Sequence, residues 1–355
     1  MVSIRDVAAK AGVSHQTVSN YINSPSIVAE KTRVRIKQAI EELGYRPNAV
    51  ARRLKTGRSD LIAIGVAASE QRKQSLIFDE FLHLLSYEAT KRGRHIMLYP
   101  RINEHEEIKY FSQLCEQSDV DAIIVDELTA GKQRSEWLMD SKVPFAVFGR
   151  VSGFSDEVAD SVTWHDTDGY SAVKEITASL IAQGKKRIGY IGWKTDTPIS
   201  LSRETAWEDA YLESGIVGSG GKALKELESW KMEVEESICD GVRAFKELLN
   251  RHPDIEAVVC ASDNLAAGIL MAVGSAKIRG CTLTLENFCV TGFDDSEVAK
   301  AMKFTSVKQP LAKIAELTVS SLVDKIEGKT PSKDETKTHL IKPEIIWRNT
   351  FANMT

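Results

Sequence analysis

Two patterns of hydrophobic and polar positions divide this chain. As far as residue 56, apolar residues recur at helical spacing in short segments separated by glycine or proline. From Leu61 onward, short apolar runs typical of buried strands alternate with longer amphipathic segments typical of helices. The pattern predicts a small all-helical unit followed by a larger body of parallel βαβ units.

The first two predicted helices have the features of a helix-turn-helix. Ser3 and Ser14 are placed to cap them, and Gly12 stands where a tight turn needs a residue that tolerates positive φ. Ala8 is small enough for two helices to cross, and Val18 can anchor the second helix. The outward positions can all hydrogen-bond and none is acidic; they are His15, Gln16, Thr17, Ser19 and Asn20. This surface suits base edges and phosphates in a major groove, although any two short amphipathic helices give a similar pattern.

A third helix is predicted from about Lys31 to Leu43, with Gly44 ending it. Its apolar positions can close a three-helix core; they are Val34, Ile36, Ile40 and Leu43. Asn48 can cap a fourth, short helix of sequence AVARRLKT, and residues 57–59 form a polar joint to the body.

The body is predicted to alternate strands and helices in two similar runs, which suggests two lobes. The expected strands are residues 61–67, 95–99, 121–126, 144–149, 187–193, 257–262, 288–295 and 339–349. The expected helices are residues 75–93, 106–117, 135–141, 166–183, 203–214, 241–252, 264–274 and 311–327. The glycine-rich stretch 215–222 is expected to be a surface loop, because it lacks the preceding strand and the following GK[ST] of a phosphate loop.

Composition narrows the class of protein. The chain has 355 residues, 43% hydrophobic and 27% charged, as in ordinary soluble proteins. No apolar run approaches the length that spans a bilayer and the N-terminus lacks a signal-peptide pattern, so we expect a cytoplasmic protein without membrane contact. The five cysteines form no CxxC pair, which disfavours a disulfide framework or a zinc site. No metal and no cofactor is expected.

Charge is distributed unevenly along the chain. Residues 1–60 hold eleven Lys or Arg against five Asp or Glu, a balance of +6, so the net charge of −4 leaves −10 on the remainder. A basic head on an acidic body directs the head toward a polyanion such as a nucleic acid.

Taken together, these motifs resemble the lactose/galactose-repressor (LacI/GalR) family of bacterial transcription regulators from end to end. The resemblance is strongest in IRDVAAKAGVSHQTVSNYIN and TRVRIKQAIEELGYRPNAVARRLKTGRS. Shorter pieces follow in the family's order: KKRIGYIG, SRETAWEDAYLESG, ASDNLAAGIL, VTGFDD, SVKQP and KPEIIWRNT. The resemblance implies a homodimer that binds a pseudo-palindromic operator and a small-molecule effector.

The fold that this resemblance implies is α/β. It has an N-terminal all-α helix-turn-helix headpiece at residues 1–47, and a hinge helix and linker at 48–59. A two-lobed, periplasmic-binding-protein-like core of doubly wound parallel sheets follows at 60–355, where effector binding and dimerisation are expected. The N-lobe is expected at about 60–162 and 293–322, and the C-lobe at about 163–292 and 323–355.

The resemblance places the second helix in the major groove, with His15, Gln16 and Asn20 at base-contacting positions. Asn20 stands where some members have arginine, and asparagine prefers adenine. The residues suited to phosphate contact are Arg5, Ser14, Thr17, Ser19 and Tyr45. The hinge residues expected on DNA are Ala51, Arg52, Leu54 and Lys55. Leu54 matches the apolar wedge that opens a base step in the minor groove.

The resemblance also implies an effector held between the lobes. Arg203 and Asp263 match positions that bond sugar hydroxyls or an anionic group, and Trp164 matches a position where a ring stacks on the effector. The other expected lining residues are Ser69, Phe78, Arg150 and Trp193. Alternatives stay open: Arg203 can be a surface charge, Asp263 can cap the following helix, and Trp164 can be structural packing.

Two positions depart from the family pattern. Trp193 follows a strand glycine where relatives have proline or a small residue. Acidic residues lie where relatives often contribute an aromatic ring; they are Glu233, Glu235 and Glu236. Both departures bear on the identity of the effector.

The sequence favours a DNA-binding repressor released from its operator by a sugar or sugar-like effector. A purine- or nucleoside-activated co-repressor of the same family stays open. The basic head and the absent signal pattern disfavour a plain solute-binding protein. An enzyme is disfavoured because the chain has no GxSxG elbow, Walker lysine or GxGxxG after a strand. The tail after Trp347 has no leucine heptads, so we expect a dimer and not a tetramer.

Overall fold

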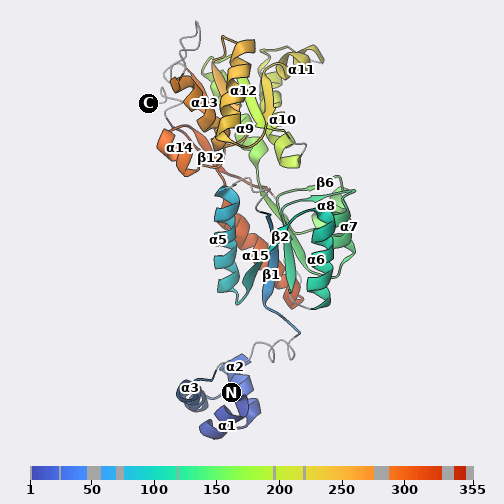
Figure 1. Cartoon of the computed structure of the whole chain (residues 1–355), viewed down its shortest axis with the longest axis vertical. Helices are drawn as coiled ribbons and strands as arrows, with labels where there is room; N and C mark the ends of the chain where they lie inside the picture. The colour runs from blue at the N-terminus through green and yellow to red at the C-terminus, as the bar shows by residue number, and fades with distance from the viewer. Residues whose placement is uncertain are drawn as a thin grey trace. The chain divides into compact units, whose positions relative to one another are not determined.

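The computed structural model describes residues 2–23, 25–45, 57–68, 76–117, 120–194, 197–218, 221–275, 288–329 and 340–348. The chain divides into two compact units, residues 1–59 and residues 60–355, whose elements are labelled in Figure 1. The predicted hinge residues Ala51, Arg52, Leu54 and Lys55 lie outside the described residues, and so does Ser69.

The first unit is built from α1 (Ile4–Ala11), α2 (His15–Asn23), the 3₁₀ turn η1 (Pro25–Ile27) and α3 (Glu30–Leu43). Ser3 and Asp6 form a capping box at α1, in which the Ser3 hydroxyl accepts from the Asp6 N–H and the Asp6 carboxylate accepts from the Ser3 N–H. Gly12 ends α1 at φ +61°, and its N–H bonds the last carbonyls of that helix. The predicted turn and the predicted cap of the first helix are confirmed.

Val7, Val18 and Ile36 are fully buried and form the centre of this unit. One part of the predicted core is wrong, because Val34 is 62% exposed. Val34 and Ile36 are two positions apart, so their side chains leave the helix on nearly opposite sides. Ala39, three positions after Ile36, is buried instead.

The second unit contains two parallel sheets. The first has the strand order β13-β7-β5-β3-β1-β2. Its strands are β1 (Leu61–Ala67), β2 (His95–Arg101), β3 (Ala122–Val125), β5 (Phe145–Phe148), β7 (Trp164–Thr167) and β13 (Leu340–Ile341). A separate short parallel pair is formed by β4 (Leu128–Thr129) and β6 (Val151–Ser152).

Helices cover both faces of the first sheet, as Figure 1 shows. On one face α5 (Leu76–Lys91) and α15 (Leu311–Glu327) pack together over buried residues such as Phe81 and Ile64. On the other face, α6 (Glu104–Glu116) and α7 (Gln133–Asp140) pack over residues such as Phe111 and Ile123, and α8 (Asp156–Ser161) lies nearby. This lobe is the expected doubly wound arrangement.

The second sheet has the order β11-β10-β8-β9. Its strands are β8 (Ile188–Trp193), β9 (Lys231–Val234), β10 (Ala257–Cys260) and β11 (Cys289–Thr291), all parallel. α9 (Gly169–Ala182) packs with α10 (Pro198–Ser214), and α12 (Ile238–Arg251) packs with α13 (Asp263–Ser275). The remaining helices of this lobe are α11 (Gly221–Glu228) and α14 (Glu297–Met302).

The chain passes between the two lobes three times: after β7, between β12 (Ser306–Lys308) and α15, and between β13 and β14 (Glu344–Ile346). β12 and β14 pair antiparallel. The predicted terminal strand 339–349 is therefore two short strands, which belong to different sheets on either side of Pro343.

These passages correct the expected lobe boundaries. The predicted helix 166–183 began too early, because residues 164–167 form β7 in the first sheet and α9 begins at Gly169. The first crossing thus follows residue 167 and not residue 162. α14 packs on α13 and residue Val307 lies in the core of the second lobe, so residues 293–308 belong there. Val323 and β13 belong to the first lobe.

Candidate functional site

The exposed face of α2 carries polar side chains arranged in short hydrogen-bonded pairs. Gln16 Nε2 donates to Asn20 Oδ1 at 3.1 Å, which joins two amides one helical turn apart. Ser14 caps α2 by accepting from the Thr17 N–H at 3.1 Å, and the two hydroxyls lie 2.9 Å apart. His15 is exposed beside them. An amide pair and a ring nitrogen on one helix face are the groups that bond base edges.

The other predicted DNA-contacting residues of the first unit differ in how far their side chains are exposed. Arg5 is exposed on α1, and Ser19 is half-buried on α2. Tyr45 is half-buried and packs against the core of this unit. Arg5 is therefore the one of these three whose side chain is open to phosphate contact without rearrangement.

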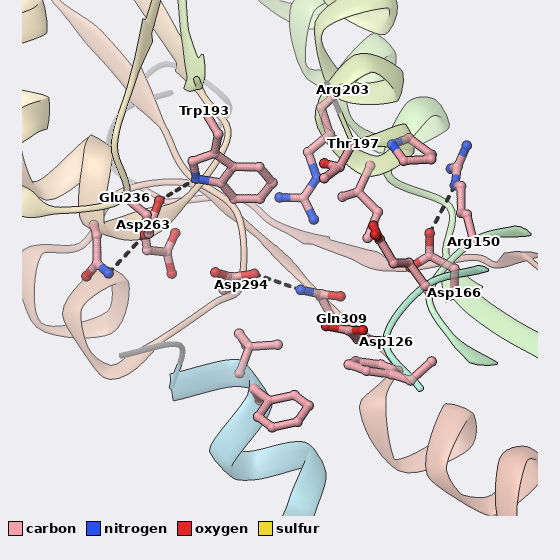
Figure 2. Close-up of a pocket in the computed structure, with 18 of the residues that line it drawn as sticks. Asp126, Arg150, Asp166, Trp193, Thr197, Arg203, Glu236, Asp263, Asp294 and Gln309 are labelled. Atoms are coloured by element: carbon pink, nitrogen blue, oxygen red, sulfur yellow. Dashed lines mark hydrogen bonds and ion pairs between the residues drawn. The ribbon is translucent and has the colours of Figure 1, made fainter. Parts of the chain in front are cut away.

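A cavity of about 520 Å³ lies within the second unit, and residues of both lobes line it. Its polar wall comes from the carboxyl ends of the parallel strands, where open α/β sheets bind ligands. Figure 2 shows these side chains converging on the cavity. The lining residues that end a strand or follow one are Asp126, Phe148, Arg150, Asp166, Trp193, Glu236, Asp263 and Asp294.

Five of the predicted effector residues line this cavity: Phe78, Arg150, Trp193, Arg203 and Asp263. Trp164 does not line the cavity, and the prediction of a stacking role for it is wrong in this structure. It is the first residue of β7 and packs in the apolar core of the first lobe. Asp166, two residues further toward the carboxyl end of the same strand, lines the cavity instead.

Arg203 is held at the centre of the second lobe's wall. Its side chain comes from α10 and is only 5% exposed. The guanidinium lies 3.5 Å from the ring centroid of Phe293 and 4.9 Å from that of Trp193, and its Nη1 donates to the carbonyl of Ala261 at 2.5 Å. Burial lowers the pKa of Arg203 below its ordinary value. Its Nε is buried without a hydrogen-bond partner among the described residues.

Asp294, which is half-buried, and Asp263, which is buried, add two carboxyl groups to the same wall. Burial raises the pKa of Asp294 to about 8, against the attraction of Arg203, and raises that of Asp263 to about 6. Asp263 accepts from Ser306 Oγ at 2.6 Å and from the Ser296 N–H at 2.7 Å. Its carboxylate therefore ties α14 and β12 together. The hydroxyl that caps α13 belongs to Ser262, which accepts from the Leu265 N–H.

The first lobe contributes carboxylates that already have cationic partners. Arg150 Nε donates to Asp166 Oδ2 at 3.0 Å, and burial raises the pKa of Asp166 despite this pairing. For Asp126 burial acts in the same direction, but Arg101 and Arg134 outweigh it and lower the pKa. These ion pairs fix the orientations of the Asp166 and Asp126 carboxylates in the cavity wall.

Gln309 links the cavity to the segments that join the lobes. Its Oε1 accepts from Thr167 Oγ1 at 2.7 Å, across two of the three crossings. Its Nε2 donates to Asp294 Oδ1 at 2.7 Å, as Figure 2 shows. A ligand that bonds Asp294 would therefore contact a residue that is hydrogen-bonded to Gln309, which lies in a segment joining the lobes.

Sequence reasoning missed several lining residues; they are Asp126, Asp166, Glu236, Asp294 and Gln309. All but Gln309 end or follow a strand of a parallel sheet, and Gln309 follows β12. Ligands bind at the carboxyl ends of parallel strands, so the polar residues that follow each predicted strand could have been named as candidates from the sequence.

The cavity combines aromatic faces with many hydrogen-bond acceptors and a buried guanidinium. This is the chemistry that binds polyhydroxylated ligands, whose C–H faces stack and whose hydroxyls bond carboxylates. Within the described ranges there is no group of three residues positioned to hold a metal ion. None of the helices described is long and apolar enough to cross a membrane.

Comparisons with known proteins agree with both units. The family model "Bacterial regulatory proteins, lacI family" matches residues 3–48, and a periplasmic binding protein-like domain matches residues 177–351. The HTH-type transcriptional regulator CelR of Thermobifida fusca is 31% identical over 344 residues, which is 95% of this chain and 96% of that protein. The HTH-type regulator GalS of Salmonella typhimurium is 28% identical over 99% of this chain and 97% of its own length.

Solved structures are similar over the same extent. The structure described as a transcriptional regulator CelR–cellobiose complex has a TM-score of 0.67 and 26% identity, and covers 99% of this chain and all of that one. A lac repressor dimer bound to operator and the anti-inducer ONPF has a TM-score of 0.76 at 21% identity, with 98% of each chain covered. At that identity the second match establishes the fold alone.

Proposed function

Since the chain belongs to the LacI family of bacterial regulatory proteins, we propose that it is an operator-binding repressor that a sugar or sugar-like effector releases from DNA. The observation that carries this proposal is the cavity of the second unit. It joins a buried guanidinium, three aromatic side chains and several carboxylates, in a chain whose first unit is a helix-turn-helix. We further propose that it works in the cytoplasm.

On DNA, α2 occupies the major groove, where the exposed His15 and Gln16 and the half-buried Asn20 contact bases. The joined amides of Gln16 and Asn20 suit adenine, because an amide accepts from its N6 amino group and donates to its N7. Residues 48–59 form the hinge helix in this proposal, with Leu54 as the wedge. A helix of about eight residues is too short to be stable alone, so it forms only with DNA and a second protomer.

The effector acts by shifting a population between two arrangements of the lobes. A ligand in the cavity contacts carboxylates of both lobes at once, and through Asp294 it meets Gln309 on the connecting segment. Arrangements that fit the ligand are favoured by its binding energy. The hinge helices of the dimer form in one arrangement and melt in the other.

The dimer interface is proposed along the edge of the first sheet. β2 is the terminal strand there, and Leu98 and Ile102 beside it are each 53% exposed. Apolar side chains on an unpaired edge strand favour pairing with another chain. A second copy of this chain supplies the matching edge by two-fold symmetry.

A thermal-shift screen tests the effector class. Cellobiose is the first probe because a similar regulator is described in complex with it. Further sugars and purine nucleosides complete the panel. A specific ligand raises the melting temperature of the second unit by mass action. A shift with a sugar supports the proposal, and a shift with purines alone contradicts the effector class.

Arg203→Ala then tests the site. We expect the variant to bind operator DNA as the wild type does but to lose its response to the sugar, because the central donor of the cavity is gone. Arg251→Ala removes an exposed arginine of the same lobe and serves as the control. If Arg203→Ala still responds with unchanged affinity, Arg203 is not part of the effector site.

A further inference from the structure

Trp193 and Glu236 form a connected pair in the wall of the cavity. Trp193 is the last residue of β8, and its indole extends toward Arg203 (Figure 2). Its Nε1 donates to Glu236 Oε2.

Glu236 accepts hydrogen bonds from two segments that are distant from it in the sequence. Besides Trp193, it accepts from Ser262 Oγ at 2.9 and 2.7 Å and from Asn264 Nδ2 at 3.0 Å. Trp193 ends β8, Glu236 follows β9, and Ser262 and Asn264 lie at the start of α13. A carboxylate that bonds both of the other segments is fixed in position, and it fixes in turn the donor of the indole.

The consequence for the indole is a defined orientation. Its ring centroid lies 4.9 Å from the Arg203 guanidinium, which also packs on Phe293 at 3.5 Å. The ring thus lies in the cavity wall with polar groups of Arg203 and Asp294 close by. A flat apolar face next to fixed hydrogen-bonding groups matches a pyranose ring, which has C–H groups on its face and hydroxyls at its edge.

The same carboxylate also adds a negative charge to this wall. The cavity lining contains seven Asp or Glu side chains against three Arg or Lys. Arg150 is paired with Asp166, and the Arg203 guanidinium lies over the rings of Trp193 and Phe293. The donors that bond Glu236 are an indole, a hydroxyl and an amide, none of which carries a positive charge. Arg203 attracts Glu236 but also attracts Asp294 and Asp166, so its single charge is shared among three acidic groups. An anionic group bound beside Trp193 therefore meets a like charge at short range.

We propose that Glu236 determines which effectors the cavity accepts. It is a positioning residue that holds Trp193 as the stacking platform for an uncharged pyranose ring, and its negative charge excludes phosphorylated sugars and sugar acids. This inference rests on the proposed function of the cavity as an effector site.

The first test needs no ligand. The full chain is labelled with 5-fluorotryptophan, and the ¹⁹F resonance of Trp193 is identified as the one lost in Trp193→Phe. Glu236→Ala is expected to shift and broaden that resonance while leaving those of buried tryptophans such as Trp207 in place, which also shows that the variant is folded. Glu235→Ala, which removes the neighbouring acid, is the matched control. An unchanged Trp193 resonance in Glu236→Ala overturns the positioning role.

The second test measures selectivity with neutral and anionic probes: cellobiose, glucose, galactose, glucose 6-phosphate, galactose 6-phosphate and glucuronic acid. The wild type is expected to bind at least one neutral sugar at least tenfold more tightly than its anionic counterpart. Glu236→Gln keeps an oxygen that can accept from the indole but removes the charge. We expect it to bind the neutral sugar within about threefold of wild type and to gain about tenfold for the anionic one, which is roughly 1.4 kcal/mol.

The outcomes separate the two proposals. Equal affinity of the wild type for a sugar and its phosphate overturns the role of Glu236 but leaves the proposed function intact. A gain for anionic sugars in Glu235→Gln equal to that in Glu236→Gln also overturns it, because the charge effect would then not belong to this position. If neither the neutral nor the anionic sugars bind, the proposed function fails as well.

Discussion

Gly12→Ala is expected to unfold the helix-turn-helix while leaving the larger unit intact. Gly12 has a φ of +61°, in the left-handed region where a side chain is strained. A Cβ at this position would lie 2.7 Å from Nη2 of Arg35, closer than real Cβ contacts. That same guanidinium group donates to the carbonyls of Ala11 and Gly12 and so ties α3 to the turn.

Two costs add in this variant. Placing a non-glycine residue in the left-handed region costs about 1–2 kcal/mol. Displacing Arg35 weakens its charged hydrogen bonds to the turn, which are worth about 1.5–3 kcal/mol each. Because the end of the Arg35 side chain can shift, we count the loss of one of its two bonds, which gives an expected total of about 2.5–5 kcal/mol. A unit of roughly 45 residues has a total stability of about 2–7 kcal/mol, so most or all of it is lost.

Gly44→Ala is the matched control. Gly44 ends α3 at φ +60°, but nothing lies within 4 Å of the position its Cβ would take. Only the backbone cost of about 1–2 kcal/mol applies there. Hydrogen exchange of the full chain measures the opening free energy of the amides in α1–α3, with amides of the second unit as an internal reference.

We expect Gly12→Ala to lower the opening free energy of these amides by at least 1.5 kcal/mol more than Gly44→Ala does, a margin that comes from the charged bonds of Arg35. Operator affinity should fall in the same order, with the sugar-induced thermal shift of the second unit unchanged. If the two variants exchange alike, the argument from Arg35 is refuted. If neither differs from wild type, the argument from positive φ is refuted as well.

Three further predictions address the hinge, the cavity and the dimer. Leu54→Ala should weaken specific operator binding far more than binding to random DNA in a salt series, since the proposed wedge acts only on a bent site; equal losses would count against it. The raised pKa of Asp294, about 8 against an ordinary 3.8, means that the unfolded chain releases this proton first as pH rises, so this group reduces stability progressively between about pH 4 and 8. Asp294→Asn should therefore gain stability relative to wild type as pH increases over that window in denaturant titrations, and a pH-independent difference would contradict the assignment. Leu98→Glu, at a half-exposed edge position, should give a folded monomer by sedimentation that has lost specific operator binding; a persistent dimer would place the interface elsewhere.

The sequence predicted correctly those features that depend only on residues close together in the chain. The Gly12 turn, the Ser3 cap and the last long helix (Leu311–Glu327) rest on capping chemistry and periodicity, which a few neighbouring residues determine. The edge strand β2 was also predicted, because His95 is followed by the apolar run Ile96, Met97 and Leu98.

What was missed depends on partners far away in the chain. β7 has only four residues, including His165 and Asp166, and becomes a strand because β5 and β13 pair with it on either side. Because part of β7 was predicted to be helical, the lobe boundary was misplaced. There was then no basis in the sequence for deciding which residue of this strand lines the cavity. Trp164 was assigned to the effector by resemblance, whereas its place at the start of β7 puts it in the core.

The role of Asp294 could not be derived from periodicity either. Its φ of +119° and its bond to Gln309 arise where β11 and β12 meet the connecting segments, a feature of tertiary structure. Arg203 was found because the motif around it is local to α10. Its stacking between Trp193 and Phe293 needed the fold.

The central claim is that one polypeptide joins a sequence-specific DNA-binding unit to a sugar-sensing unit. Selection of fragments from the genome of the source bacterium by the purified full-length protein, sequenced with and without the sugar that raises its melting temperature, tests this most directly. The account predicts enrichment of a few two-fold symmetric sites that disappears when the sugar is added and persists in Arg203→Ala. Recovery of fragments in proportion to their abundance, or enrichment that no sugar alters, would contradict it.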